Sequence, residues 1–158
     1  MSRDPVTACV GLGANLGDPV AAVRQALADL GQLPLTRLAA ASDLYRTAPH
    51  EAQGPDFINA VAVLETSLTA PDLLAALQRL EATAGRKRPW HHAPRTLDLD
   101  LLLYGDARID SPALTVPHPR WTQRAFVLVP LAQVAPARVT PQQLAAVAGQ
   151  PLARLPAD

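Results

Sequence analysis

The sequence has one cysteine, one lysine and no long apolar run among its 158 residues. The single cysteine, Cys9, excludes an intramolecular disulfide, and its apolar neighbours predict a buried, unreactive thiol. Because no stretch approaches the roughly 18 apolar residues of a membrane helix, no membrane span is expected. The first residues also lack the apolar core of a signal peptide, so we expect a cytoplasmic protein.

Neither sign of charge is in excess, because 14 basic residues balance 14 acidic ones. This balance gives no indication of a nucleic-acid partner or an anionic membrane surface, so any anion site must arise from local clustering. The length is typical of one domain, and 49% of the residues are hydrophobic, enough for a packed core. We predict a single domain over residues 1–158, and we expect a monomer.

The order of the predicted elements indicates a fold class. Alternating or continuous apolar runs predict strands, and cap, proline and glycine signals predict helices. The predicted elements are a strand at 7–12, a helix from Asp18-Pro19 to Gly31, strands at 36–45 and 59–65, a helix from Pro71 to Gly85, and a strand at 96–103. This βαββαβ order is typical of a ferredoxin-like α+β sandwich, with helices on one face of an antiparallel sheet.

A C-terminal extension follows these elements. Residues 114–119 are predicted to be extended, 120–128 to form a short helix, and Thr140-Pro141 to begin a last one. Near the other end, Gly11 and Gly13 suggest a phosphate loop only weakly. Walker A requires a Gly-Lys-Ser/Thr ending, and the dinucleotide fingerprint requires a third glycine where Leu16 stands. We therefore interpret the glycine pair as part of a structural turn.

Asp98 and Asp100 alternate with leucines in the predicted strand at 96–103. Side chains of a strand alternate between faces, so the leucines are expected in the core and both aspartates on the opposite face, roughly 6.6 Å apart. Two such charges repel by about 2.4 kcal/mol at an effective dielectric of 20. A cation between them would relieve this repulsion, and two carboxylates with substrate phosphates are a common Mg²⁺ arrangement. The alternative is an ordinary amphipathic strand with its polar face in water.

Basic residues lie directly before this acidic strand, with no acid between Arg86 and Arg95. Cations beside a carboxylate pair suit a Mg²⁺-polyphosphate, since arginine matches phosphate oxygens. A surface with ordinary salt bridges is the alternative. The histidines lack the spacing of a zinc site, because no Cys-x-x-Cys or His-Glu-x-x-His is present.

Five segments, in order, carry a resemblance to a known family. They are 11–18 (GLGANLGD), 45–49 (YRTAP), 55–60 (PDFINA), 91–102 (HHAPRTLDLDLL) and 116–120 (VPHPR). Together they resemble the hydroxymethyl-dihydropterin pyrophosphokinases of folate biosynthesis, over about residues 7 to 135. The segment at 91–102 is similar to the central signature of that family, whose fold is ferredoxin-like.

The resemblance implies a reaction and a set of site residues. The pterin hydroxymethyl oxygen would attack the β-phosphorus of ATP and release AMP. Asp98 and Asp100 would bind two Mg²⁺ ions, and Arg86 and Arg95 would contact the phosphates as catalytic residues. The implied nucleotide site also includes Gln78, Glu81, Leu101, Thr115, His118 and Arg124. The implied pterin pocket consists of Thr47, Pro49, Phe57, Asn59 and Phe126.

Some positions depart from the family pattern, and two other functions stay open. The segment 49–55 is one residue shorter than usual, and the segment 86–94 is shorter than in some relatives, which affects loop geometry more than the reaction. One alternative is a ferredoxin-like binding module without catalysis. The other is a different Mg²⁺-dependent nucleotidyl or phosphoryl transferase that uses the same aspartates.

Overall fold

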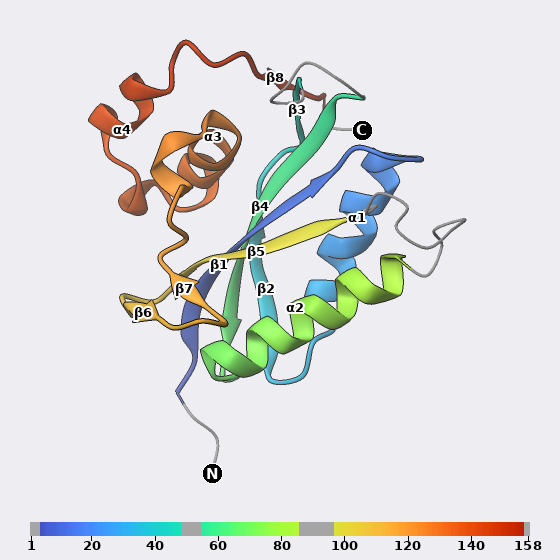
Figure 1. Ribbon diagram of the computed structural model, residues 1–158, viewed down its shortest axis with the longest axis vertical. Helices are drawn as coiled ribbons and strands as arrows, with labels where there is room; N and C mark the ends of the chain where they lie inside the picture. The colour runs from blue at the N-terminus through green and yellow to red at the C-terminus, as the bar shows by residue number, and fades with distance from the viewer. Residues whose placement is uncertain (1–3, 49–54, 86–96, 157–158) are drawn as a thin grey trace.

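The computed structural model describes residues 4–48, 55–85 and 97–156. These residues form a mixed α/β structure with one large antiparallel sheet and four α-helices (Figure 1). The elements in chain order are β1 (Val6–Ala14), α1 (Pro19–Leu30), β2 (Thr36–Ala41), β3 (Tyr45–Thr47), β4 (Phe57–Thr66), α2 (Ala70–Gly85), β5 (Asp98–Tyr104), β6 (Ile109–Asp110), β7 (Thr115–Val116), α3 (Ala125–Val134), α4 (Pro141–Ala146) and β8 (Ala153–Arg154), with short 3-10 turns at Trp121–Gln123 and Pro136–Arg138.

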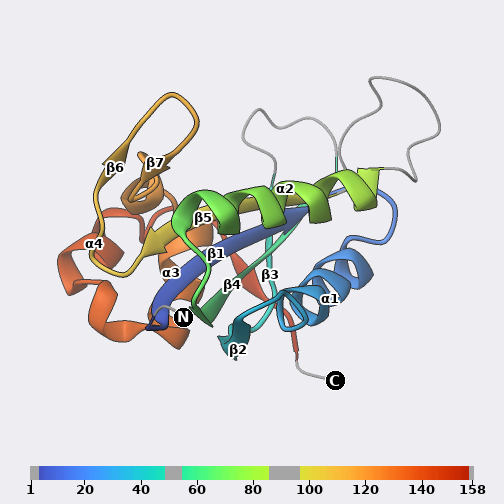
Figure 2. The ribbon, with the colours of Figure 1, turned by 90° about the horizontal axis from the view of Figure 1, so that it is seen from below.

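The large sheet has the strand order β5-β1-β4-β3-β8, and β2 pairs with β4 beside β3. Helices α1 and α2 cover one face, where their leucines and Val23 pack on alternate residues of β1, β4 and β5. Helix α3 packs on the other face, through Val127 and Leu131 on Val61 and Val63 (Figure 2). The two helices expected in the sandwich therefore lie on one face as predicted, and the C-terminal extension adds an apolar helix on the opposite face.

Local signals fixed the starts of α1 and α4 as predicted, whereas the helix expected at 120–128 runs from Ala125 to Val134 after a 3-10 turn. The carboxylate of Asp18 accepts a hydrogen bond from the backbone N–H of Ala21, and Pro19 occupies the first helical position. Thr140 begins α4 with a capping box, in which its side chain and that of Gln143 each accept a backbone N–H. None of the helices among residues 4–48, 55–85 and 97–156 is both long and apolar enough to cross a bilayer.

Two predictions near the sheet were wrong. The single strand expected at 36–45 is divided into β2 and β3, because the backbone N–H of Ser42 donates to Val61 and the Ser42 hydroxyl accepts the Val61 N–H. These bonds end β2 and let the chain pair again further along β4. Gly11 and Gly13 lie inside β1 rather than in a turn. The turn comes later, at Gly17, whose φ of 64° suits glycine.

The thiol of Cys9 faces the α3 side of the sheet and is only 2% exposed. Burial raises its pKa to about 11, and the nearby positive charge of Arg138 opposes this rise. At pH 8 the native thiol is therefore protonated and shielded, as the sequence predicted.

Iodoacetamide at pH 8 should modify native Cys9 about 100-fold or more slowly than the unfolded chain, because both thiolate fraction and access are reduced. Mass spectrometry of samples taken over time, with and without denaturant, measures the two rates. Equal rates under both conditions would contradict the burial of this residue.

Candidate functional site

The carboxylates of Asp98 and Asp100 stand on the exposed side of β5. Both aspartates are exposed, whereas Leu97, Leu99 and Leu101 are buried, each at 5% exposure or less. The three leucines belong to the same core cluster as the leucines of α2. The alternation at residues 97–101 therefore buries the leucines on one face of the sheet and places both carboxylates on the opposite face. Helix α3 packs on that opposite face, further along β5.

Glycines stand opposite both acids on the neighbouring strand. In the register of β1 and β5, Gly13 pairs with Asp98 and Gly11 with Asp100. Paired residues of adjacent strands share a face, so β1 places no side chain directly opposite either carboxylate. The side chain of Leu102 lies over Gly11, 3.5 Å from where a Cβ atom would stand. A Cβ atom added to Gly13 would lie 3.1 Å from Oδ1 of Asn59, which is tighter than ordinary contact.

The row of residues across the sheet continues to Asn59, which pairs with Gly13 from the other side. The Asn59 amide is 5% exposed and donates through Nδ2 to Oγ1 of Thr47 at 2.9 Å. Phe57 is half-buried and pairs with Thr47, so all three residues share the face of the aspartates. With strands about 4.8 Å apart, Asn59 and Asp98 stand roughly 10 Å from one another.

Helix α3 adds Phe126 and Arg124 above this face. Phe126 is half-buried and packs against the cluster that contains Val61 and Val63. The guanidinium carbon of Arg124, directly before the helix, lies 5.4 Å from the centroid of the Phe126 ring. This distance is within the range of a cation–π interaction, which favours placing the Arg124 guanidinium over the Phe126 ring.

Helix α2 borders the open edge of β5. The carboxylate of Glu81 accepts a hydrogen bond of 2.8 Å from the backbone N–H of Leu99, the residue between the two aspartates. Because β5 is an edge strand, this bond takes the place of a neighbouring strand. Gln78, three residues earlier on α2, is exposed. The bond from Glu81 to Leu99 could not be predicted from local patterns, since only the folded chain brings the two residues together.

The remaining predicted nucleotide residues lie around the same strand. Thr115 is exposed in β7, which contacts β5, and the backbone N–H of His118 donates to the carbonyl of Leu102 at 2.9 Å. Leu101 differs from them, because its side chain is 4% exposed and belongs to the core. Its side chain therefore faces the core and not the exposed side of β5. Pro49, Arg86 and Arg95 lie outside the described residues.

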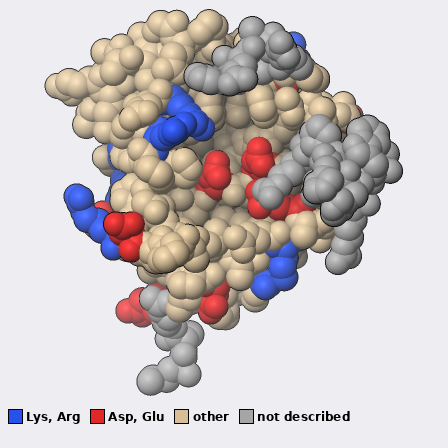
Figure 3. Space-filling view, in the orientation of Figure 1, with Lys and Arg blue, Asp and Glu red and all other residues tan. Residues whose placement is uncertain are grey.

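Figure 3 places acidic side chains in a hollow over β5, with basic side chains nearby at α3. Among residues 4–48, 55–85 and 97–156, no group of three or more His, Cys, Asp or Glu side chains could enclose a metal ion. Two exposed carboxylates on one side of a strand nevertheless fit a hard cation such as Mg²⁺, which is usually bound by one or two carboxylates, water and substrate phosphates. The donor set therefore suits a metal that arrives with a phosphate-bearing substrate.

Replacing Glu81 with alanine should make the Leu99 amide exchange with solvent about fivefold faster, because one hydrogen bond contributes about 1 kcal/mol. Glu81→Gln retains an acceptor and should have a smaller effect. Hydrogen exchange followed by NMR measures both, and Arg79→Ala, on the exposed side of the same helix, is the control. Unchanged protection in Glu81→Ala would refute a role of this bond in holding β5.

Known proteins resemble this chain in sequence and fold. A family model for 7,8-dihydro-6-hydroxymethylpterin-pyrophosphokinase (HPPK) matches residues 9–136. A 2-amino-4-hydroxy-6-hydroxymethyldihydropteridine pyrophosphokinase of Pseudomonas aeruginosa is 46% identical over 93% of this chain and 95% of the relative. A protein of the same name from Haemophilus influenzae is 44% identical over 86% of both chains.

Solved structures agree on the fold. An HPPK-DHPS structure from Plasmodium falciparum superposes with a TM-score of 0.70 at 15% identity, over 86% of this chain and 43% of that chain. An HPPK-DHPS structure in complex with substrates superposes with a TM-score of 0.67 at 11% identity, and this chain spans 40% of its length. At such low identity these two comparisons bear on the fold alone. The family model and the relatives show that this chain belongs to the 7,8-dihydro-6-hydroxymethylpterin-pyrophosphokinase family.

Proposed function

We propose that the protein transfers a pyrophosphoryl group from ATP to the hydroxymethyl group of 6-hydroxymethyl-7,8-dihydropterin and releases AMP, in folate biosynthesis. Membership of the family and the names of its relatives support this activity. The structural observation that carries the proposal is the row on one sheet face in which Asp98, Gly13 and Asn59 stand side by side. On this row a phosphate chain would lie at the aspartate end and a polar heterocycle at the Asn59 end.

At the donor end, Asp98 and Asp100 would hold two Mg²⁺ ions that arrive with the ATP triphosphate. When bound, the metal neutralises phosphate charge and supplies electrostatic stabilisation of the group in transfer. Gln78, Glu81, Leu101, Thr115, His118 and Arg124 would surround the nucleotide, with Leu101 contributing its backbone because its side chain is buried. Arg86 and Arg95 would contact the phosphates, since guanidinium groups match phosphate oxygens.

At the acceptor end, the pterin would lie between the rings of Phe57 and Phe126. Offset stacking between aromatic rings favours this arrangement, and both rings are half-buried on the same side of the sheet. The Asn59 amide, oriented by its bond to Thr47, would offer a donor and an acceptor to the polar edge of the pterin. Thr47 and Pro49 would complete the pocket.

The chemical step would depend on position more than on a protein base. The hydroxymethyl oxygen forms a bond to the β-phosphorus while the bond from that phosphorus to the α–β bridging oxygen breaks, and AMP leaves with this oxygen. Among residues 4–48, 55–85 and 97–156, no side chain near Asn59 on this face is an evident base, so the hydroxyl proton would pass to water. The chain would accelerate the reaction by aligning both substrates, by excluding water and by balancing charge through Arg95.

We further propose that β1, α1, β2, β4, α2 and β5 form a ferredoxin-like βαββαβ unit to which β3 is added. The sheet order β5-β1-β4-β2 supports this assignment. A single domain, a monomeric state and a cytoplasmic location stay predictions from the sequence.

Wild-type protein incubated with ATP, Mg²⁺ and the hydroxymethyl-dihydropterin should produce AMP, and Asp98→Ala or Asp100→Ala should lower turnover by about 100-fold or more. Chromatography of the nucleotides measures this, and circular dichroism checks that the variants are folded. Asp110→Ala, which removes an exposed acid of β6, is the control. Production of ADP would indicate an ordinary kinase, and no nucleotide product would favour a binding module.

Arg95→Ala should lower kcat far more than it raises the dissociation constant for ATP, because its charge is expected to act mainly on the group in transfer. Single-turnover kinetics and equilibrium titration with a non-hydrolysable ATP analogue separate the two quantities. Equal losses in both would argue against a role in the transition state.

A further inference from the structure

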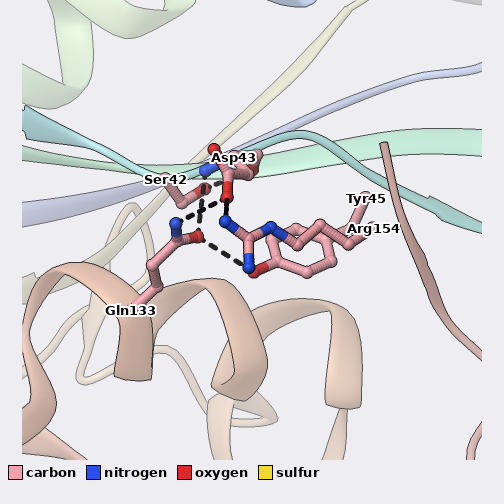
Figure 4. A network of polar contacts seen from close by, with 5 residues as sticks. All are labelled: Ser42, Asp43, Tyr45, Gln133 and Arg154. Carbon is pink, nitrogen blue, oxygen red and sulfur yellow. Dashed lines mark hydrogen bonds and ion pairs between the residues drawn. The ribbon is translucent and has the colours of Figure 1, made fainter. Parts of the chain in front are cut away.

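A polar network joins the C-terminal part of the chain to the strand that carries Thr47 (Figure 4). Its centre is Gln133, in the last turn of α3. The Gln133 Oε1 atom accepts two hydrogen bonds of 2.9 Å, from the backbone N–H of Asp43 and from the hydroxyl of Tyr45. Its Nε2 atom donates to the carboxylate of Asp43 at 2.8 Å. The amide of one side chain thus fixes both the backbone and a side chain of the link between β2 and β3.

The same carboxylate extends the network to β8. The guanidinium of Arg154 forms an ion pair with Asp43, and Arg154 pairs with Tyr45 across the sheet. The backbone N–H of Leu155 adds a bond of 2.8 Å to the carbonyl of Leu44. Strand β3, three residues long, is consequently held by β4 on one edge, by β8 on the other and by α3 from above.

Tyr45 links this network to the residues proposed for the pterin. The ring is 5% exposed and faces the same side of the sheet as Asn59, with which Tyr45 is paired. Asn59 in turn donates to Thr47, two residues beyond Tyr45 on β3. Any shift of β3 relative to β4 would therefore alter the distance between the Asn59 amide and the Thr47 hydroxyl.

Helix α3 carries the opposite wall of the same pocket. Phe126 and Gln133 are seven residues apart, which is about two helical turns, so they lie on the same side of the helix. Helix α3 contacts both β3 and β4. The end of the helix at Gln133 is fixed to the link before β3, and the end at Phe126 lies over the sheet face that carries Asn59.

We propose that Gln133 is a positioning residue that sets the separation between the two walls of the acceptor pocket, Phe126 on α3 and the Thr47–Asn59 pair on the sheet. This inference rests on the proposed function for the identity of the acceptor. It assigns to the C-terminal extension a role in acceptor binding, although Gln133, Asp43 and Arg154 stand outside the pocket. Gln133 acts through Tyr45 and the backbone of β3 and touches no substrate.

The test compares three variants. Gln133→Ala removes all three amide bonds, and Tyr45→Phe removes only the hydroxyl that reaches Gln133 while it keeps the buried ring. Gln25→Ala is the matched control, because it makes the same change on α1, where the exposed Gln25 amide donates to Asp29 within that helix.

Steady-state kinetics should show KM for the hydroxymethyl-dihydropterin raised about tenfold in Gln133→Ala and less in Tyr45→Phe, with KM for ATP within twofold of wild type. Gln25→Ala should leave both constants unchanged. A loss of thermal stability in Gln133→Ala without a change in the pterin constant would overturn the proposal, since the residue would then be merely structural. If Gln133→Ala does not fold, an unchanged pterin constant in Tyr45→Phe would overturn it.

A second readout needs no turnover and separates this inference from the proposed function. The side-chain amide of Asn59 gives its own pair of signals in a ¹H–¹⁵N spectrum of the substrate-free protein. These signals should shift in Gln133→Ala and Tyr45→Phe and stay in place in Gln25→Ala. Unchanged Asn59 signals in both variants would refute the positioning role. Shifted signals in a protein without pterin turnover would instead refute the proposed function.

Discussion

The alternation of leucine and aspartate along β5 is the constraint on which the rest of the site depends. Leu99 and Leu101 of this strand share a core cluster with the leucines of α2, and they fix the direction of the acidic neighbours, because successive side chains of a strand point to opposite faces. A shift of one residue in the register of β5 would bury Asp98 and Asp100 and expose Leu99. The burial of the leucines therefore opposes a shift in register and holds the two mutually repelling carboxylates on the same face of the strand.

The neighbouring strand β1 lies between this pair of charges and Asn59 on β4. On the face of the aspartates, Gly11 and Gly13 place no side chain of β1 opposite the carboxylates. The side chain of Leu102 lies over Gly11, and the Asn59 amide of β4 lies beside Gly13. A larger residue at position 13 would press on the Asn59 amide. The proposed donor and acceptor ends lie on this row, and the hydrogen bonds of the sheet would set their spacing.

Features of the fold and the site could be predicted from the sequence where they depend on residues close together in the chain. The faces of β5 and the start of α1 at Asp18 follow from local patterns, and both were predicted correctly. The division between β2 and β3 could not be predicted, since it depends on bonds between Ser42 and Val61, which meet only in the folded sheet. For the same reason the hydrogen bond from the Leu99 N–H to the Glu81 carboxylate could not be predicted. Thr47 and Asn59 were named through the family resemblance alone, because strand pairing brings them together.

The pairing of β3 with β8 has a consequence for the order in which the chain can assemble. Tyr45 meets Arg154, which follows it by about a hundred residues, so this contact closes one of the longest loops in the molecule. Contacts of such range form late, after the local helices and the hairpins of the sheet. During synthesis on the ribosome, the side of the protein proposed to bind the acceptor would therefore be completed after residues 98–104 of β5 have been made.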